Sequence, residues 1–154
     1  MIRKPYAHSG HKKSKGKTSN KSAALKLCDI LWSKVVRERD QHMCQACGRP
    51  GNQPHHIFSR RHMATRHDSC NGITLCYGCH NHKAHGNPEE FRDFILNRLG
   101  QQEFERLKVK AYANAHNADF AMTKISLEVE LKLLADGVGI APAPRMKVSR
   151  VGAA

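Results

Sequence analysis

Residues 71–85 read NGITLCYGCHNHKAH, and this stretch decides how the rest of the chain is interpreted. It places two cysteines, three histidines and a leading Asn-Gly pair within fifteen residues. Cys76 and Cys79 form a C-x-x-C pair, which lets a tight turn present two thiolates to one metal ion. A tetrahedral site needs two further ligands, so the fold depends on which other residues supply them.

A second C-x-x-C pair, Cys44 and Cys47, precedes the first with 28 residues between them. Two such pairs complete a tetrahedral sulfur site for zinc. We therefore predict that a structural zinc ion binds the four paired cysteines, Cys44, Cys47, Cys76 and Cys79. Two alternatives stay open: His80 could replace Cys79 as the fourth ligand, or the cysteines could serve a redox or iron–sulfur role.

The balance of charged residues favours a polyanionic partner. The 154 residues include 26 lysines and arginines against 13 acidic residues, a net charge of +13. Nucleic acid is the expected partner and a membrane is not, because no run of residues approaches the length that spanning a bilayer requires. The first residues lack the apolar segment of a secretory signal, so we expect a cytoplasmic protein. Thiols stay reduced in the cytoplasm, which favours metal binding or burial of the cysteines over disulfides.

The chain is expected to form one domain with two tails. Residues 1–21 are rich in lysine and contain no acidic residue. We predict a flexible basic arm there, which binds DNA or RNA phosphate or serves only as a solubilising tail. Residues 22–136 form the predicted domain. Residues 137–154 are rich in Pro, Ala and Gly, and we predict a second flexible tail.

Apolar periodicity predicts an α+β fold that is mainly helical, with one small β-hairpin. Strands are expected at residues 55–58 and 73–75, and a helix is expected directly after the second strand. The other helices are expected at residues 22–40, 88–99, 101–115 and 123–135. Asn87 is a capping residue, and Gly100 is expected to end the helix that Asn87 begins. Cys28 lies in an apolar helical stripe and is expected to be buried, whereas Cys70 is expected to be a spare thiol.

The histidines extend the pattern beyond the cysteines. In chain order the motif is H-H-I at residues 55–57, N-G-I-T-L at residues 71–75 and C-x-x-C-H at residues 76–80. This order resembles the HNH endonuclease family in its zinc-bound form. The resemblance implies a ββα-metal core, flanked here by helices, and a metal-dependent endonuclease that hydrolyses DNA phosphodiester bonds.

The resemblance also implies a role for each motif residue. His56 would be the general base that takes a proton from the attacking water. His55 and His80 would bind the catalytic divalent cation. Asn71 would form hydrogen bonds across the hairpin and hold the loop of His56 in place.

These residue types suit phosphodiester hydrolysis independently of the resemblance. Imidazole is partly neutral near pH 7 and can act as a base there. A cation offsets the charge on the phosphate and on the leaving oxygen. Because His55 and His56 are neighbours, they would point to opposite faces of a strand. We therefore expect a bent or bulged backbone if both histidines serve one site.

Basic side chains near the motif are candidate DNA contacts: Arg60, Arg61, Arg66 and Lys83. The arginines lie between the two halves of the motif, where guanidinium groups would bind phosphate. Ordinary surface cations are the alternative interpretation. His82 and His85 are expected to be exposed helix histidines, with substrate contact as the alternative.

The flanking residues resemble a narrower group, the phage recombination endonucleases of the NinG/Rap family. The similar residues are VRERD at 36–40, the following C-x-x-C-G, and RDFILNRLGQQEFERL at 92–107. This resemblance implies cleavage of branched DNA, including Holliday junctions, during phage recombination. The chain departs from that family at His55 and His80, where the family has Gly and Asn, and is closer there to general HNH enzymes.

Three functions follow from these observations. The first is an HNH endonuclease that acts on branched DNA, for which a symmetric homodimer would be the simplest assembly. The second is a general HNH nuclease that nicks or cuts duplex DNA, in a toxin-like or defence setting or another. The third is a non-catalytic zinc module that binds nucleic acid, for which the histidines and the asparagine would not be needed.

The ligand chemistry predicts which cation supports cleavage. Imidazole nitrogens suit Mn²⁺ and Ni²⁺, whereas Mg²⁺ prefers oxygen ligands. With His55 and His80 as ligands, DNA cleavage with Mn²⁺ or Ni²⁺ is expected to be at least as fast as with Mg²⁺. Initial rates of cleavage in each metal after treatment with EDTA would measure this. Cleavage with Mg²⁺ alone would contradict the assignment of both histidines.

Overall fold

The computed structural model describes residues 15–113 and 118–138. In this part of the chain the protein is mainly helical and contains a two-stranded antiparallel sheet, which confirms the predicted balance of helix and strand. The elements in chain order are α1 (Lys15–Arg39), β1 (Gln53–His56), the 3-10 helix η1 (Ser69–Asn71), β2 (Gly72–Leu75), the π-helix η2 (Cys79–His85), α2 (Pro88–Leu99), α3 (Gln101–Tyr112) and α4 (Phe120–Ala135).

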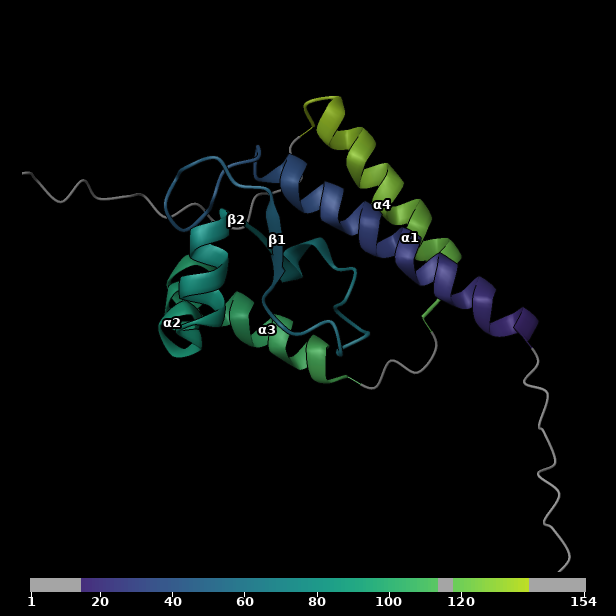
Figure 1. Ribbon diagram of the computed structural model, residues 1–154, viewed down its shortest axis with the longest axis horizontal. Coiled ribbons are helices and arrows are strands. Elements are labelled where there is room, and N and C mark those ends of the chain that lie inside the picture. Colours follow the sequence, from purple (N-terminus) through teal and green to yellow (C-terminus); the bar gives the residue numbers. More distant parts are fainter. Residues whose placement is uncertain (1–14, 114–117, 139–154) are drawn as a thin grey trace, which may run out of the picture.

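The helices form layers on both sides of the sheet (Figure 1). On one side α1 packs against both strands, and α4 lies along α1. On the other side η2 leads into α2, which packs against α3. The two short strands therefore lie between a long helix and a group of shorter helices.

Strand β2 is buried along its whole length because both of its faces are covered. Ile73 and Leu75 belong to the apolar cluster on the side of α2. Thr74 faces α1, and its hydroxyl donates a hydrogen bond to the backbone oxygen of Val36 over 3.2 Å. Gly72 also meets α1, since a Cβ atom at this position would lie 2.3 Å from Val36 Cγ2.

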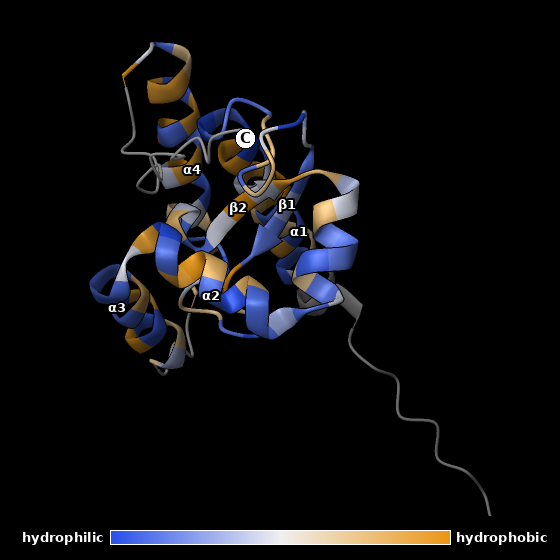
Figure 2. Cartoon of the chain, turned by 90° about the vertical axis from the view of Figure 1, so that its left-hand side faces the viewer, coloured by the Kyte–Doolittle hydropathy of each residue, from blue (hydrophilic) through white to orange (hydrophobic). Residues whose placement is uncertain are grey.

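The register of the sheet decides which way each histidine of β1 faces. His55 is paired with Ile73, and His56 is paired with Gly72. Paired residues of an antiparallel sheet share a face, and neighbours along a strand alternate. His55 therefore faces η2 and α2, whereas His56 faces α1. Strand β1 is hydrophilic along its length, unlike β2 (Figure 2).

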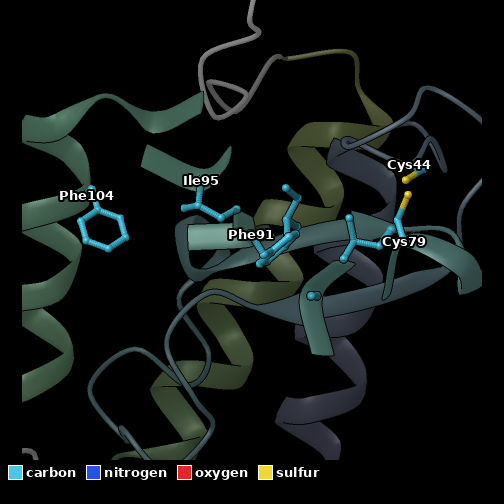
Figure 3. Packing of buried hydrophobic residues seen from close by; sticks show 8 residues of the cluster. Cys44, Cys79, Phe91, Ile95 and Phe104 are labelled. Carbon is cyan, nitrogen blue, oxygen red and sulfur yellow. The ribbon is translucent and has the colours of Figure 1, made fainter. Parts of the chain in front are cut away.

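Two clusters of buried side chains hold these layers together. One joins β2 to η2, α2 and α3, and Figure 3 shows its members Cys44, Ile73, Leu75, Cys79, Ala84, Phe91, Ile95 and Phe104. The other lies between α1 and α4 and contains Cys28, Trp32, Val35, Val36 and Leu127. The predicted burial of Cys28 is therefore confirmed.

A buried ion pair at the end of α1 connects that helix to β2. Arg39 Nε donates to Asp40 Oδ1 over 2.9 Å, and both side chains are only 3% exposed. Arg39 also donates to the backbone oxygens of Ser69 and Gly72, over 2.6 and 2.8 Å. Asp40 Oδ2 accepts the backbone N–H of Thr74 over 2.7 Å. The two side chains thus fix the start of β2 against the last turn of α1.

Two predicted boundaries were wrong in the first half of the chain. Helix α1 begins at Lys15 and not at residue 22, because the lysine-rich stretch before Ser22 continues the helix. Strand β1 ends at His56 and not at Phe58. Beyond His56 the backbone bonds to Asn71 instead of continuing the ladder: the N–H of Ile57 donates to the backbone oxygen of Asn71 over 2.9 Å.

Boundaries in the second half are closer to the prediction. Asn87 accepts a hydrogen bond from the N–H of Glu90 and caps α2, and Gly100 ends that helix, as predicted. Helix α4 begins at Phe120, three residues earlier than expected, because the carboxylate of Asp119 caps it. Most of the predicted basic arm and of the predicted C-terminal tail lies outside the described residues.

None of the helices within residues 15–113 and 118–138 is long and apolar enough to cross a bilayer.

Replacing Gly72 by alanine is expected to destabilise the protein. The new Cβ atom would lie 2.3 Å from Val36 Cγ2 and 2.8 Å from Trp32 Cζ2, and both neighbours are buried. Overpacking of this kind costs about 1–3 kcal/mol, which urea unfolding would measure. Gly78→Ala is the control, because the nearest atom to its Cβ would be 3.9 Å away. Equal unfolding midpoints for the two variants would contradict the prediction.

Candidate functional site

The four paired cysteines come together as predicted from their spacing. Their sulfur atoms all lie within 4.8 Å of one another, so the group could hold a metal ion such as zinc. Cys44 and Cys47 lie in the turn that follows α1, where the N–H of Gly48 donates to the backbone oxygen of Cys44 over 2.8 Å. Gly48 has a φ of 72°, a conformation that favours glycine and lets this tight turn form.

The arrangement of sulfurs fits a tetrahedral ion. A Zn–S distance of about 2.3 Å places two sulfurs of a tetrahedron about 3.8 Å apart. The sulfurs of Cys47 and Cys76 are 3.7 Å apart. Those of Cys44 and Cys79 point toward each other in Figure 3. Cys70 does not belong to the group, which agrees with its interpretation as a spare thiol.

The charges around the sulfurs are uneven. The guanidinium of Arg49 lies 3.5 Å from the sulfur of Cys47, and its hydrogen bond lowers the pKa of that thiol to about 6. Burial has the opposite effect on the inner cysteines: it raises the pKa of Cys44, and it raises that of Cys79 to about 12. A divalent cation among the four sulfurs would favour the thiolate form of each.

Three histidines form a second group that could hold a metal ion. Ring nitrogens of His55, His80 and His85 all lie within 4.8 Å of one another. The ring of His55 lies 5.2 Å from each of the other two rings, measured between centroids. His55 and His80 were the predicted ligands. His85 was expected to be an exposed helix histidine; it is exposed, and the structure also adds it to the group.

The π-helix explains why His85 was missed. An α-helix turns about 100° per residue, so five residues would place two side chains about 140° apart. In a π-helix the hydrogen bonds run from residue i to i+5, so side chains five residues apart share a face. His80 and His85 lie in η2, and their ring centroids are 4.6 Å apart. The five-residue spacing is the sequence signal, but it is informative only for a π-helix.

His56 lies on the other face of β1 and is held by α1. Its ring stacks on Trp32 at 3.6 Å between centroids with an interplanar angle of 15°. Its Nε2 lies 2.9 Å from the backbone oxygen of Arg66. A carbonyl can only accept a hydrogen bond, so Nε2 carries the proton of the neutral ring and Nδ1 is left as the basic nitrogen.

Both histidines of β1 are neutral at pH 7. Burial lowers the pKa of His55 to about 4, and the nearby His80 and His85 add to this effect. Burial is also the main cause of the pKa of about 4 at His56, although the hydrogen bond to Arg66 opposes it. A neutral ring is the form that binds a metal ion and the form that accepts a proton.

One cavity of about 570 Å³ is bordered by residues from both faces of β1. Its lining includes His55, His56, His80 and His85. Four consecutive residues, 54–57, border it, so the cavity runs along the strand and is not confined to one face. The antiparallel register is regular through His56, so β1 contains no bulge, and the backbone bends directly after it, at Ile57 and Phe58. Whether both histidines serve one site stays a prediction.

Asn71 holds the loop between the strands by its side chain. It is fully buried, and its Oδ1 accepts the N–H of Phe58 over 2.7 Å. Its Nδ2 donates to the backbone oxygens of Phe58 and Thr65, over 2.9 and 3.0 Å. These are hydrogen bonds across the hairpin, two residues beyond His56, of the kind expected for Asn71.

Arg66, one of the predicted DNA contacts, is engaged within the protein. It forms two hydrogen bonds to Asp29 of α1, over 2.8 and 2.7 Å. His67 contacts the same carboxylate over 2.9 Å. Burial would raise the pKa of Asp29, but the hydrogen bonds from Arg66 and His67 outweigh it and lower that pKa. Arg66 therefore anchors the backbone whose carbonyl oxygen accepts the hydrogen bond of His56, a role the sequence did not indicate.

The other candidate DNA contacts are exposed. Arg60 borders the cavity, and Arg61 and Lys83 lie at the surface. Whether they bind DNA stays a prediction. Asp29 and Trp32 also border the cavity and were not predicted as site residues, because on the sequence they are part of an ordinary helix.

Comparison with known proteins supplies no relative for this site. The chain matches no protein-family model, no curated protein and no solved structure. The resemblance to HNH endonucleases therefore rests on the motif residues alone.

The cysteine group is expected to bind one zinc ion per chain. Replacing Cys47 by serine should remove that ion and lower the melting temperature, because the binding energy of structural zinc, about 10–16 kcal/mol, depends on the folded site. Elemental analysis and thermal unfolding would measure both effects. Cys70→Ser is the control and should keep the zinc content and melting temperature of the wild type. Loss of zinc from both variants, or from neither, would contradict the assignment.

Proposed function

We propose that the protein is a metal-dependent endonuclease of the HNH type that hydrolyses DNA phosphodiester bonds. The observation that carries this proposal is the cavity along β1. It combines a group of three imidazoles with a fourth, neutral imidazole whose basic nitrogen is set by a backbone hydrogen bond. Binding alone requires neither feature, whereas hydrolysis requires both a cation and a base.

Each histidine has a distinct role in this proposal. His55, His80 and His85 would hold the divalent cation, which supplies positive charge at the phosphate and at the leaving oxygen. His56 would accept the proton of the attacking water at Nδ1. Trp32 and the backbone of Arg66 keep the ring of His56 in one orientation, so its basic nitrogen is in place before substrate binds.

The cysteine group would have a structural role. A zinc ion there would join the turn after α1 to the start of η2, because Cys44 and Cys47 lie in the turn and Cys79 begins the π-helix. Since η2 carries His80 and His85, the zinc site would also support the positions of two ligands of the catalytic cation.

DNA is the proposed substrate because of charge. The net charge of +13 favours a polyanion, and Arg60 lies at the cavity where a phosphate would enter. Branched DNA, including Holliday junctions, is the favoured form, as the resemblance of the flanking residues to phage recombination endonucleases implies. Ordinary duplex DNA is the second candidate within the same chemistry.

A non-catalytic zinc module that binds nucleic acid is the alternative from another class. The cysteine group and the basic charge would serve such a module equally well. The second group of metal-binding side chains weighs against it, because a module that only binds would not need a second cation beside a neutral histidine.

His56→Ala is expected to lower the rate of DNA cleavage by about 10²- to 10⁴-fold, the usual contribution of a general base. DNA affinity and zinc content should stay near wild type, because the cysteine group lies elsewhere. Cleavage rates with Mn²⁺, gel-shift affinities and elemental analysis would measure the three quantities. Unchanged cleavage would remove His56 from the mechanism.

A second pair of variants separates catalysis from folding in this experiment. His85→Ala should raise the Mn²⁺ concentration needed for half-maximal cleavage. His82→Ala is its matched control, because His82 is an exposed histidine of the same π-helix outside the three-histidine group. A protein that binds zinc and DNA but cuts nothing with any cation would support the non-catalytic alternative.

A further inference from the structure

A second cavity, of about 380 Å³, lies beside the first. The two cavities share His55 and Ile57, so the second cavity adjoins the three-histidine group at His55. It extends between the end of β1 and the helices α2 and α3. Nothing in the proposed hydrolysis uses this space, although a DNA strand at the first cavity would pass next to it.

Four of the eleven residues that line this cavity are phenylalanine or tyrosine. Phe91 and Phe104 are 7% and 5% exposed and form fixed walls. The ring of Phe58 lies 5.4 Å from that of Phe104, between centroids. The two rings pack on each other and form one apolar side of the cavity, which suits a partly apolar group.

Tyr112 forms the open side of the cavity. It is the last residue of α3, and 67% of its surface is exposed. Two rings nevertheless hold it in place: Phe58 at 6.4 Å and His62 at 4.8 Å between centroids. An exposed aromatic ring that is fixed by its neighbours is suited to stacking on a base of single-stranded nucleic acid.

Positive charge lies at the rim. The guanidinium of Arg92 is 5.6 Å from the centre of the Phe104 ring, above the cavity wall. Lys108 also borders the cavity and pairs with Glu105 over 3.2 Å, but both side chains are about half exposed. Exposed pairs of this kind contribute little, so a phosphate group could compete for the lysine. The cavity thus combines an aromatic interior with a cationic rim.

We propose that this cavity binds an unpaired nucleobase of the DNA strand that is cut, next to the scissile phosphate. The base would stack on Tyr112, and Arg92 and Lys108 would contact the adjacent phosphate. This inference rests on the proposed endonuclease function and specifies its substrate: DNA with unpaired or easily unpaired bases at the cleavage site.

The proposed pocket has a direct energetic consequence. A base inside a duplex must be unstacked and unpaired before it can enter a protein pocket, whereas a base at a branch point or in a single strand pays little of this cost. The pocket would therefore favour branched or single-stranded DNA over uniform duplex. That preference would come from this chain's own residues and not from the resemblance of its flanking segments.

The test uses the full-length His56→Ala protein with Mn²⁺, so that the DNA stays intact. The probes are a four-way DNA junction with 2-aminopurine at the branch point and a duplex of matched sequence. Binding should change the 2-aminopurine fluorescence of the junction but not that of the duplex. Adding Tyr112→Ala should abolish the change and weaken junction binding by about 5- to 150-fold, the contribution of one stacked base, with duplex binding unchanged.

Three further variants act as controls. Tyr112→Phe keeps the ring and should behave as the parent protein. Tyr77→Ala removes a tyrosine of similar exposure, 72%, outside the cavity and should also have no effect. Arg92→Gln should reduce the slope of log affinity against log salt concentration by about 0.7, as expected for one lost phosphate contact on a single strand.

The outcomes separate this proposal from the proposed function. No fluorescence change on the junction, or an equal loss of junction and duplex binding in Tyr112→Ala, would overturn the base pocket, even if the wild-type protein cuts DNA. An equal loss of binding would indicate a structural role for Tyr112. A normal fluorescence signal on the junction with Tyr112→Ala would also overturn the proposal, and the cavity would then serve another class of partner. A fluorescence change that depends on Tyr112 in a protein that never cuts DNA would keep the base pocket and overturn the nuclease.

Discussion

The buried ion pair of Arg39 and Asp40 is the interaction on which the position of the sheet depends. Two strands of four residues cannot fix their own position, and this pair ties the backbone of β2 and of η1 to the last turn of α1. Loss of one partner from a buried pair leaves an uncompensated charge and costs about 3–5 kcal/mol. The position of both strands is therefore set relative to the long helix α1.

The position of the sheet between two helical layers gives two neighbouring histidines different surroundings. His55 meets His80 and His85 of the π-helix, and His56 meets Trp32 of α1. Because paired residues share a face, the small size of Gly72 opposite His56 leaves room for α1 to approach. One strand can therefore place two histidines with different surroundings at one cavity.

Helix α1 also organises the loop between the strands. Asp29 binds Arg66 and His67, and the backbone oxygen of Arg66 accepts a hydrogen bond from Nε2 of His56. The indole N–H of Trp32 donates to the backbone oxygen of Asp68 over 2.8 Å. The loop is thus held from the helix side by these contacts and from the sheet side by Asn71. Such preorganisation suits a site in which a base must be oriented before the substrate arrives.

The sequence by itself determined the local chemistry: each C-x-x-C pair, the neighbouring histidines and the cap of α2 act over short spacings. Only the tertiary structure decided which distant residues meet. The π-helix brings His85 to His80, and Asp29 forms hydrogen bonds to Arg66, which was predicted to contact DNA. The packing of α3 beside β1 places Tyr112 at the second cavity. The physical reason is that ligand spacing and capping are local, whereas helical register and side-chain pairing depend on packing between elements.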